Sequence, residues 1–197
     1  MNTSPQIDVS QVPAHLRNHP KFLKEMTDLL SRLSKPEYLD LFAKHEAGHE
    51  HYFREAGVTR FEYIPPLISY REANEEEPFL GQWARIKTLD YKQPEDDGWL
   101  FKLAKGYAAG GECSRRLTTT DYAGDTIDRK LWDEMCADCY KDSTLAKPEV
   151  DAIADDLWVK AQKTVGKELE SEELKSQIRK RAREITPLLY PWTLSLT

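Results

Sequence analysis

The chain is poor in the features that define several classes of protein. It has three cysteines among 197 residues, an odd and small number that favours a reducing compartment over a disulfide framework. No apolar run approaches the roughly 20 residues of a membrane-spanning helix. Residues 1–8 lack the basic and apolar regions of a signal peptide. We therefore expect a soluble, cytoplasmic protein with no membrane partner.

An excess of positive charge is also missing. The chain has 28 Lys and Arg against 34 Asp and Glu, a net charge of −6. Nucleic acid attracts basic surfaces, so this balance argues against nucleic acid as the main partner. The length suits one domain with a real core, and there is no repeat and no low-complexity segment. We expect a single domain over residues 1–197.

Histidine is scarce too, but three of the five histidines lie between residues 45 and 51. His45-Glu46-Ala47-Gly48-His49 is an H-E-x-x-H motif. A helix places residues four apart on one face, so His45 and His49 can bind one zinc ion with Glu46 beside it as a general base. Glu46 and His49 also form a Glu-x-x-His, but the second such pair that a di-iron site needs is absent.

Local signals predict a helix beneath this motif. Ser34 and Glu37 have capping-box spacing, and Pro36 suits the first turn. Gly57 suits the left-handed residue that follows a helix. Apolar residues between these ends repeat with a 3.6-residue period on the face that carries both histidines. Gly48 costs about 1 kcal/mol relative to Ala in a helix, which indicates that another segment approaches closely there.

The whole pattern predicts a mainly α fold, zincin-like, with a small β-hairpin or sheet after the motif helix. We expect an extended arm at 1–18, a zinc-site core at 35–142 and C-terminal helices at 143–197. Apolar periodicity predicts the remaining helices at 20–33, 96–112, about 126–142, 149–165 and 172–185, and strands at 58–64 and 81–86. We expect Pro65 and Pro66 to end the first strand and Pro187 to end the last helix.

Two cysteines form a CxxC at Cys136 and Cys139. A structural zinc site would need a second pair, and a thioredoxin-like site would need a preceding strand. The pair lies in an apolar run with helical period, which predicts buried helix cysteines.

A catalytic zinc ion needs a third protein ligand. No histidine follows His51, so this ligand must be a carboxylate or, less favourably, Cys113. The candidate carboxylates are Glu112, Asp121, Asp125 and Asp128. Asp128 shares a helix face with Leu131, and a carboxylate aimed inward is costly unless it is paired or metal-bound. Without a metal, Asp125 would serve as an N-cap and Asp128 as a first-turn acid favoured by the helix dipole.

The motif and several later segments resemble the peptidase domain of FtsH-type ATP-dependent zinc proteases. The H-E-A-G-H at 45–49 looks like the motif of that family. Four later segments are similar to segments of the family: 58–65 to a strand ending in proline, 79–82 to an aliphatic-Gly segment, 105–112 to a Gly/Ala-rich stretch, and 118–128 to a Thr-Gly-Ala…Asp segment. The family's stretch ends in Ala-Glu-Glu, which this chain replaces with residues 110–113, Gly-Gly-Glu-Cys. The resemblance covers roughly residues 35–142.

In the family, the Asp that ends the last segment is the third zinc ligand, sixteen residues after the first Glu of Ala-Glu-Glu. Asp128 lies sixteen residues after Glu112. If the chain is instead aligned with the family on the threonines at 118–120, the family's ligand Asp corresponds to Asp125. The resemblance therefore implies Asp128 as third ligand, with Asp125 as second choice. Glu112 would orient a ligand histidine or line the site.

The resemblance implies a Zn²⁺-dependent metalloendopeptidase that acts on a protein or peptide, with Glu46 activating a zinc-bound water. The strand near 81–86 could hold an extended peptide by edge pairing. The chain has no Walker motif, so we expect activity without ATP. It also departs from the family at Glu50 and His51, where the family usually turns apolar. The alternative is a non-catalytic zinc-binding regulatory or interaction protein that keeps the peptidase fold.

Overall fold

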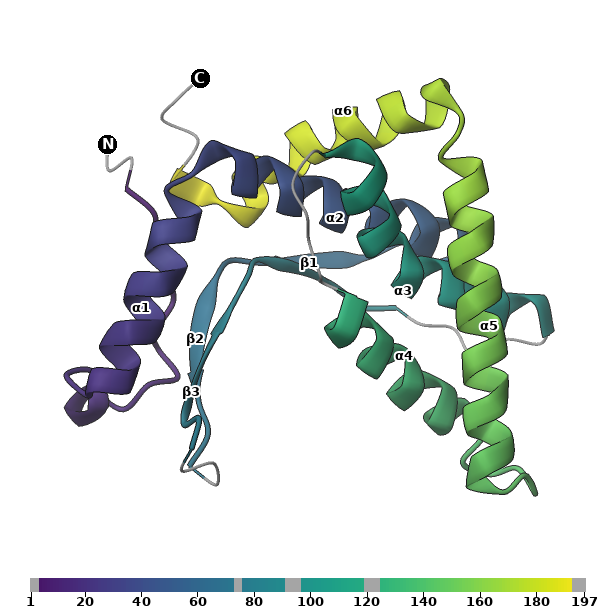
Figure 1. Ribbon diagram of the computed structural model, residues 1–197, viewed down its shortest axis with the longest axis horizontal. Coiled ribbons are helices and arrows are strands. Elements are labelled where there is room, and N and C mark those ends of the chain that lie inside the picture. The colour runs from purple at the N-terminus through teal and green to yellow at the C-terminus, as the bar shows by residue number, and fades with distance from the viewer. Residues whose placement is uncertain (1–3, 73–75, 91–96, 119–124, 193–197) are drawn as a thin grey trace.

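A computed structural model describes residues 4–72, 76–90, 97–118 and 125–192 (Figure 1). Its elements are a 3₁₀ turn at Ala14–Leu16, α1 Pro20–Leu33, α2 Pro36–Glu55, β1 Phe61–Ile64, β2 Leu67–Tyr70, β3 Phe79–Gln82, β4 Arg85–Thr88, α3 Asp97–Leu117, α4 Asp125–Cys139, α5 Lys147–Glu168 and α6 Glu172–Leu189. The expected mainly α fold with a small β region is confirmed. None of the described helices combines the length and apolar character needed to cross a membrane.

Helix α2 lies at the centre of the molecule. It packs against α3 and α6, while α3 packs in turn against α4 and α5. From Leu41 to Phe53 most residues of α2 are buried, and the buried set includes charged as well as apolar side chains. Burial of a polar group is costly unless it is paired. Each polar residue of this helix therefore requires a partner on a neighbouring element.

Small residues allow α2 and α3 to pack closely. A Cβ atom built on Gly48 would lie 2.5 Å from Cys113 Sγ and 3.0 Å from the Ala109 carbonyl oxygen. The first distance is shorter than real Cβ contacts, and the second is tighter than most of them. A side chain at this position would therefore displace Cys113 and press on the α3 backbone. The close approach expected at Gly48 is confirmed.

The start of α2 differs from the expectation. Ser34 is the C-cap of α1, where its hydroxyl donates to the Ser31 carbonyl, and Lys35 is the N-cap of α2 without a side-chain cap. The predicted capping box of Ser34 and Glu37 is therefore wrong. The reason is that Lys35 precedes Pro36, and a residue before proline is pushed out of the helical region; Lys35 has φ −102° and ψ 116°. At the other end, Gly57 has φ +90°, as expected.

The β region is a long bent hairpin rather than two isolated strands. β1 pairs with β4 and β2 pairs with β3, both antiparallel. Ile64 pairs with Arg85 and Leu67 with Gln82, so two residues intervene on each side and the register continues across the gap. The strand expected at 81–86 is therefore split, and β2 lies just beyond the proline pair expected to end the first strand. Proline interrupts the hydrogen-bond ladder there without reversing the chain.

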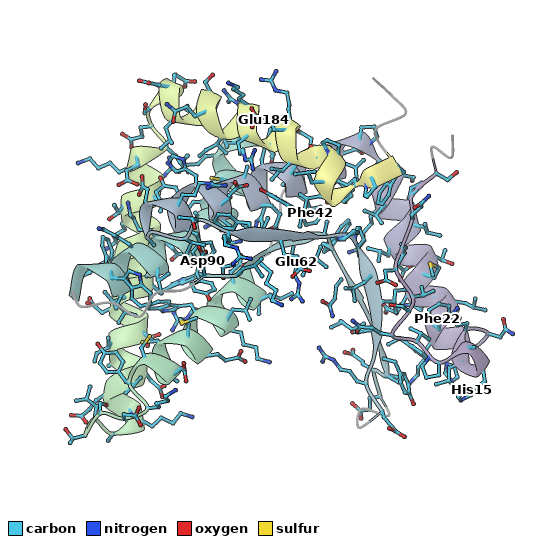
Figure 2. All side chains as sticks on the ribbon, turned by 180° about the vertical axis from the view of Figure 1, so that it is seen from behind. His15, Phe22, Phe42, Glu62, Asp90 and Glu184 are labelled. Carbon is cyan, nitrogen blue, oxygen red and sulfur yellow. The ribbon has the colours of Figure 1, made fainter. Side chains whose placement is uncertain are left out.

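The hairpin faces α2 on one side only. Figure 2 shows Phe42 on the α2 side of the strand pair and Glu62 on the side away from that helix. The N-terminal arm joins the outer edge of β2 at Asp8, whose N–H donates to the Pro66 carbonyl and whose carbonyl accepts from Ile68. The arm thus covers the edge of β2.

The C-terminal helices run longer than expected. Helix α6 continues through Pro187 to Leu189, instead of ending at 185. Tyr190 and Trp192 are buried after it. Proline removes one hydrogen bond from the last turn, and the burial of this apolar tail offsets the loss.

The two CxxC cysteines lie in α4 as free thiols. Cys136 is buried as expected, whereas Cys139 is half-buried. Burial raises the pKa of both thiols. Both are therefore protonated and weakly nucleophilic at neutral pH.

Replacing Gly48 with alanine should destabilise the protein despite the better helix propensity of alanine. Overpacking costs about 1–3 kcal/mol, against a propensity gain of about 1 kcal/mol. Urea unfolding measures the difference. Adding Cys113→Ala should recover part of the loss, because it removes the nearest clashing atom. A Gly48→Ala protein that gains stability on its own would contradict this account of the α2–α3 contact.

Candidate metal centre

The two motif histidines meet at their Nε2 atoms. His45 and His49 lie one turn apart on α2 and are only 4% and 6% exposed. Their Nε2 atoms are 3.0 Å apart. Two imidazole nitrogens at this distance repel through their lone pairs unless a proton or a metal ion lies between them.

Partners on α3 hold the other ring nitrogens. His49 Nδ1 lies 2.7 Å from the Gly106 carbonyl oxygen, and His45 Nδ1 lies 3.1 Å from Ser114 Oγ. A carbonyl oxygen only accepts, so His49 Nδ1 carries a proton, and when the ring is neutral its Nε2 lone pair faces the site. This arrangement is typical of metal-ligating histidines, whose second nitrogen donates to a carbonyl or carboxylate.

Asp128 completes the group from α4. Its Oδ2 lies 3.3 Å from His45 Nε2, and its Oδ1 lies 3.4 Å from His49 Nε2. One donor atom from each of the three residues lies within 4.8 Å of the other two. Asp128 is 8% exposed, so it faces inward as its helical phase indicates.

The other carboxylates take different positions. Helix α4 begins at Asp125, but the side chain of Asp125 and all of Asp121 lie outside the described residues. Glu112 pairs with Arg115 at 2.7 Å and with Arg116 at 3.4 Å. We expected Glu112 to orient a ligand histidine or to line the site. The residues that contact the histidine rings are instead Ser114 and Gly106.

Cys113, the less favoured ligand candidate, packs against Gly48. It is fully buried, and burial raises the pKa of its thiol.

The donor set fits a zinc ion. Two imidazole nitrogens and one carboxylate are ligands that Zn²⁺ takes in catalytic sites, with a fourth position left for water or substrate. Asp128 Oδ2 is buried without a hydrogen bond of normal geometry. Burial opposes the charged form of His49, but the nearby Asp128 carboxylate outweighs it and raises the pKa of His49 to about 9. The three groups thus favour a positive charge between them, whether proton or metal.

Glycine keeps the space around the histidines open. A Cβ atom at Gly110 would lie 2.3 Å from His49 Nε2 and 2.6 Å from His45 Nε2. Any side chain at this position would displace the rings. Gly106, Gly110 and Ser114 are spaced by four residues along α3, so one face of this helix supplies both histidine partners and the free space between them.

Glu46 lies beside this group at the edge of the hairpin. It is 6% exposed, and its Oε2 accepts a hydrogen bond of 2.8 Å from the Ile86 N–H of β4. Burial raises the pKa of the Glu46 carboxyl, while His45 and His49 oppose the rise. Glu46 is therefore a carboxylate shielded from bulk water and oriented by a strand.

A pocket of about 450 Å³ opens onto the three donor residues and Glu46. Its remaining lining comes from Phe42, Phe53, residues 82–88, Tyr107, Ile127 and Leu131. Ile127 is 68% exposed and Leu131 is 40% exposed, both on the α4 turns that flank Asp128. Large apolar side chains thus stand open to solvent next to the donor group.

The outer edge of β4 borders this pocket. Leu89 N–H donates to the Arg60 carbonyl, so the odd-numbered residues of β4 direct their backbone groups toward β1. Backbone groups of Ile86 and Thr88 consequently face away from β1, and both residues line the pocket.

Comparison of the chain with protein-family models, curated proteins and solved structures found no match.

The structure adds residues that sequence reasoning missed, namely Ser114, Gly106 and Ile86 as partners of the motif side chains. The four-residue spacing of small residues on α3 was a usable signal for the first two. No sequence signal marks Ile86, because its contribution is a backbone N–H.

We expect about one zinc ion per chain, and Asp128→Ala, His45→Ala or His49→Ala should each weaken zinc binding by more than about 100-fold, since even residues behind the ligands contribute about 10–100-fold. Asp125→Ala removes an acid from the first turn of α4 and should instead cost about 0.3–1 kcal/mol of stability. Competition with a zinc chelator measures the affinity. Asp133→Ala, an exposed aspartate on the same helix, is the matched control.

Full affinity in Asp128→Ala with loss in Asp125→Ala would exchange the two assignments. Full affinity in both histidine variants would remove the site.

Proposed function

We propose that the chain is a zinc-dependent peptide hydrolase. The observation that carries this proposal is the convergence of His45, His49 and Asp128 next to a buried Glu46 at a strand-edged pocket. Bound zinc acts as a Lewis acid on a carbonyl oxygen and lowers the pKa of a bound water to about 7. His45, His49 and Asp128 would hold the ion.

Glu46 would be the catalytic base. It neighbours His45 in the chain, and its carboxylate is buried at the pocket. Its role is to take a proton from the attacking water and return that proton to the leaving amine of the cleaved peptide. A carboxylate shielded from bulk water suits this role, because its basicity is higher than in solution.

The edge of β4 would bind the substrate backbone. Its outward backbone groups at Ile86 and Thr88 run along the pocket. Because the Ile86 N–H already donates to Glu46, the Ile86 carbonyl and the backbone groups of Thr88 would pair with the substrate. An extended peptide can pair with such an edge as an added strand. This pairing would bring a peptide bond beside the metal centre independently of side-chain sequence.

The pocket walls favour an apolar substrate side chain. Ile127 and Leu131 expose apolar surface next to Asp128, and Phe53 and Tyr107 line the same pocket. Burying such surface against a large apolar side chain stabilises the complex by about 25 cal/mol per Å². Unfolded protein segments, which expose such side chains in extended backbone, are the substrate class that fits best.

A second candidate is a non-catalytic zinc-binding protein that keeps this site for stability or partner recognition. The hydrogen bond between Glu46 and the Ile86 N–H favours it, because one oxygen of the proposed base is already engaged.

Glu46→Gln decides between the two. Glutamine keeps an acceptor oxygen for the Ile86 N–H but cannot accept the proton of water. We expect normal zinc content and a loss of hydrolysis of about 100-fold or more, measured on unfolded casein and on a peptide library read by mass spectrometry. Glu62→Gln, on the opposite face of the hairpin, should remain fully active. A zinc-loaded wild type that cleaves nothing would support the non-catalytic alternative.

A charge in the apolar wall should change substrate choice. Ile127→Asp should lower kcat/KM about 10-fold or more for peptides with a large apolar residue at the cleavage site, since one lost methylene is already worth about 10-fold or more. Peptides with alanine there should be affected less. Val159→Asp, on exposed α5 surface, serves as the control. Equal loss on both peptide sets would show that Ile127 does not select the substrate.

A further inference from the structure

We propose that Arg181, acting through Glu50 and Tyr63, is a positioning residue that holds the substrate-binding edge of β4 over the metal centre. The inference rests on the proposed function in one respect, that β4 binds the substrate. The contacts that anchor the strand stand independently of it.

Glu50 is the starting point because it is an acid inside the protein. It lies one turn after Glu46 on α2 and is only 1% exposed. A buried carboxylate is costly unless it is paired and hydrogen-bonded, so its neighbours explain why it is tolerated here.

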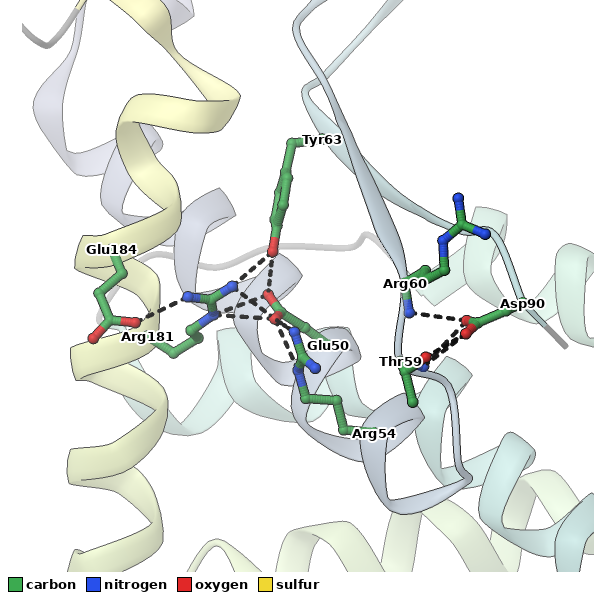
Figure 3. A network of polar contacts seen from close by, with 8 residues as sticks. All are labelled: Glu50, Arg54, Thr59, Arg60, Tyr63, Asp90, Arg181 and Glu184. Atoms are coloured by element: carbon green, nitrogen blue, oxygen red, sulfur yellow. Dashed lines mark hydrogen bonds and ion pairs between the residues drawn. The ribbon is translucent and has the colours of Figure 1, made fainter.

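Three side chains surround the Glu50 carboxylate (Figure 3). Arg54 Nη2 donates to Oε1 at 2.7 Å, and Arg181 Nη2 donates to the same oxygen at 2.8 Å. The Tyr63 hydroxyl donates to Oε2 at 3.1 Å and accepts from Arg181 Nη2 at 2.7 Å. Arg54 belongs to α2 itself. Arg181 and Tyr63 therefore join α6 and β1 to the motif helix.

The same strand pair is held at a second point. Tyr63 of β1 is the register partner of Ile86 of β4, and the Ile86 N–H donates to Glu46. Two carboxylates one helical turn apart, Glu46 and Glu50, thus bind the two members of one cross-strand pair. Packing of α2 against β4 and of α6 against β1 agrees with this arrangement.

The Glu46–Ile86 and Glu50–Tyr63 contacts differ in whether their carboxylate takes part in the proposed reaction. As the base, Glu46 gains a proton during the reaction, and the loss of its negative charge weakens the hydrogen bond that it accepts from Ile86. Glu50 takes no part in the proposed chemistry, and its ion pairs persist. The Arg181–Glu50–Tyr63 contact holds β1, and through its pairing with β1 it would keep β4 in place while Glu46 transfers a proton.

Another polar contact of the hairpin does not provide this hold. Asp90 accepts from the backbone N–H groups of Thr59 and Arg60 (Figure 3), which ties the two strand ends to each other. It joins the strands but not the strand pair to α2.

Hydrogen exchange tests the anchor without reference to activity. Tyr63→Phe and Arg181→Gln should each speed exchange of the β4 amides about 10-fold, because the strand opens locally more often. Amides of α5 should keep the wild-type rate. Arg183→Gln, an exposed arginine on the same helix, is the matched control. Unchanged exchange in β4, or an equal rise in α5, would overturn the proposal.

Kinetics then test positioning of the substrate. For peptides of about six residues or more, which span the strand, both variants should raise KM about 5–10-fold with kcat within about 2-fold, the pattern of lost uniform binding. Dipeptide-sized substrates and zinc content should be unaffected. Arg181→Lys should recover part of the effect. An equal loss of kcat on short and long substrates would contradict a positioning role.

The two measurements separate this inference from the function on which it rests. If no variant and no wild-type sample cleaves any peptide, the proposed hydrolase fails, and the exchange data still decide whether Arg181 anchors β4. If cleavage is normal in every variant and exchange is unchanged, the anchor fails and the hydrolase stands.

Discussion

The structure depends on one constraint, the burial of a helix that carries charged and polar side chains along its length. Helix α2 places His45, Glu46, His49 and Glu50 in the interior. Each unpaired group would cost several kcal/mol in that environment. The surrounding elements are arranged to pair them: α3 serves the two imidazole Nδ1 atoms, α4 supplies a carboxylate, β4 supplies an N–H, and α6 supplies a guanidinium. The fold and the candidate site are consequences of the same requirement.

Close packing of α2 and α3 makes this pairing possible. Glycine at Gly48 on one helix and at Gly106 and Gly110 on the other brings the backbones near enough for a main-chain carbonyl to reach a histidine ring. Larger residues would hold the helices apart and leave the ring nitrogens without partners. The glycines therefore influence the hydrogen bonding of the histidines only by setting the distance between α2 and α3.

Features governed by local periodicity could be predicted from the sequence. The motif helix, the inward face of Asp128 and the mainly α composition all follow from apolar spacing. Features that depend on the conformation of neighbouring residues or on the backbone alone could not be predicted. Ser34 has good cap chemistry, but the extended conformation of Lys35 before Pro36 moved the helix start. β2 was missed because Pro65 and Pro66 resemble a strand end, although the hairpin register passes through them. The hydrogen bond from Ile86 to Glu46 involves the backbone N–H of Ile86, so the type of residue at this position does not predict it.

The placement of Asp128 has a consequence for folding. It lies 79 residues after His49 and on a different helix. A metal ion held by both would be a reversible cross-link that closes a long loop between α2 and α4. The ligands come together only when the chain folds, so the ion would bind the folded state and leave the unfolded chain without the link. Binding to the folded state alone raises its stability by mass action, so the free metal concentration would set how firmly α4 docks. The same ion would then govern both the chemistry of the pocket and the persistence of one of its walls.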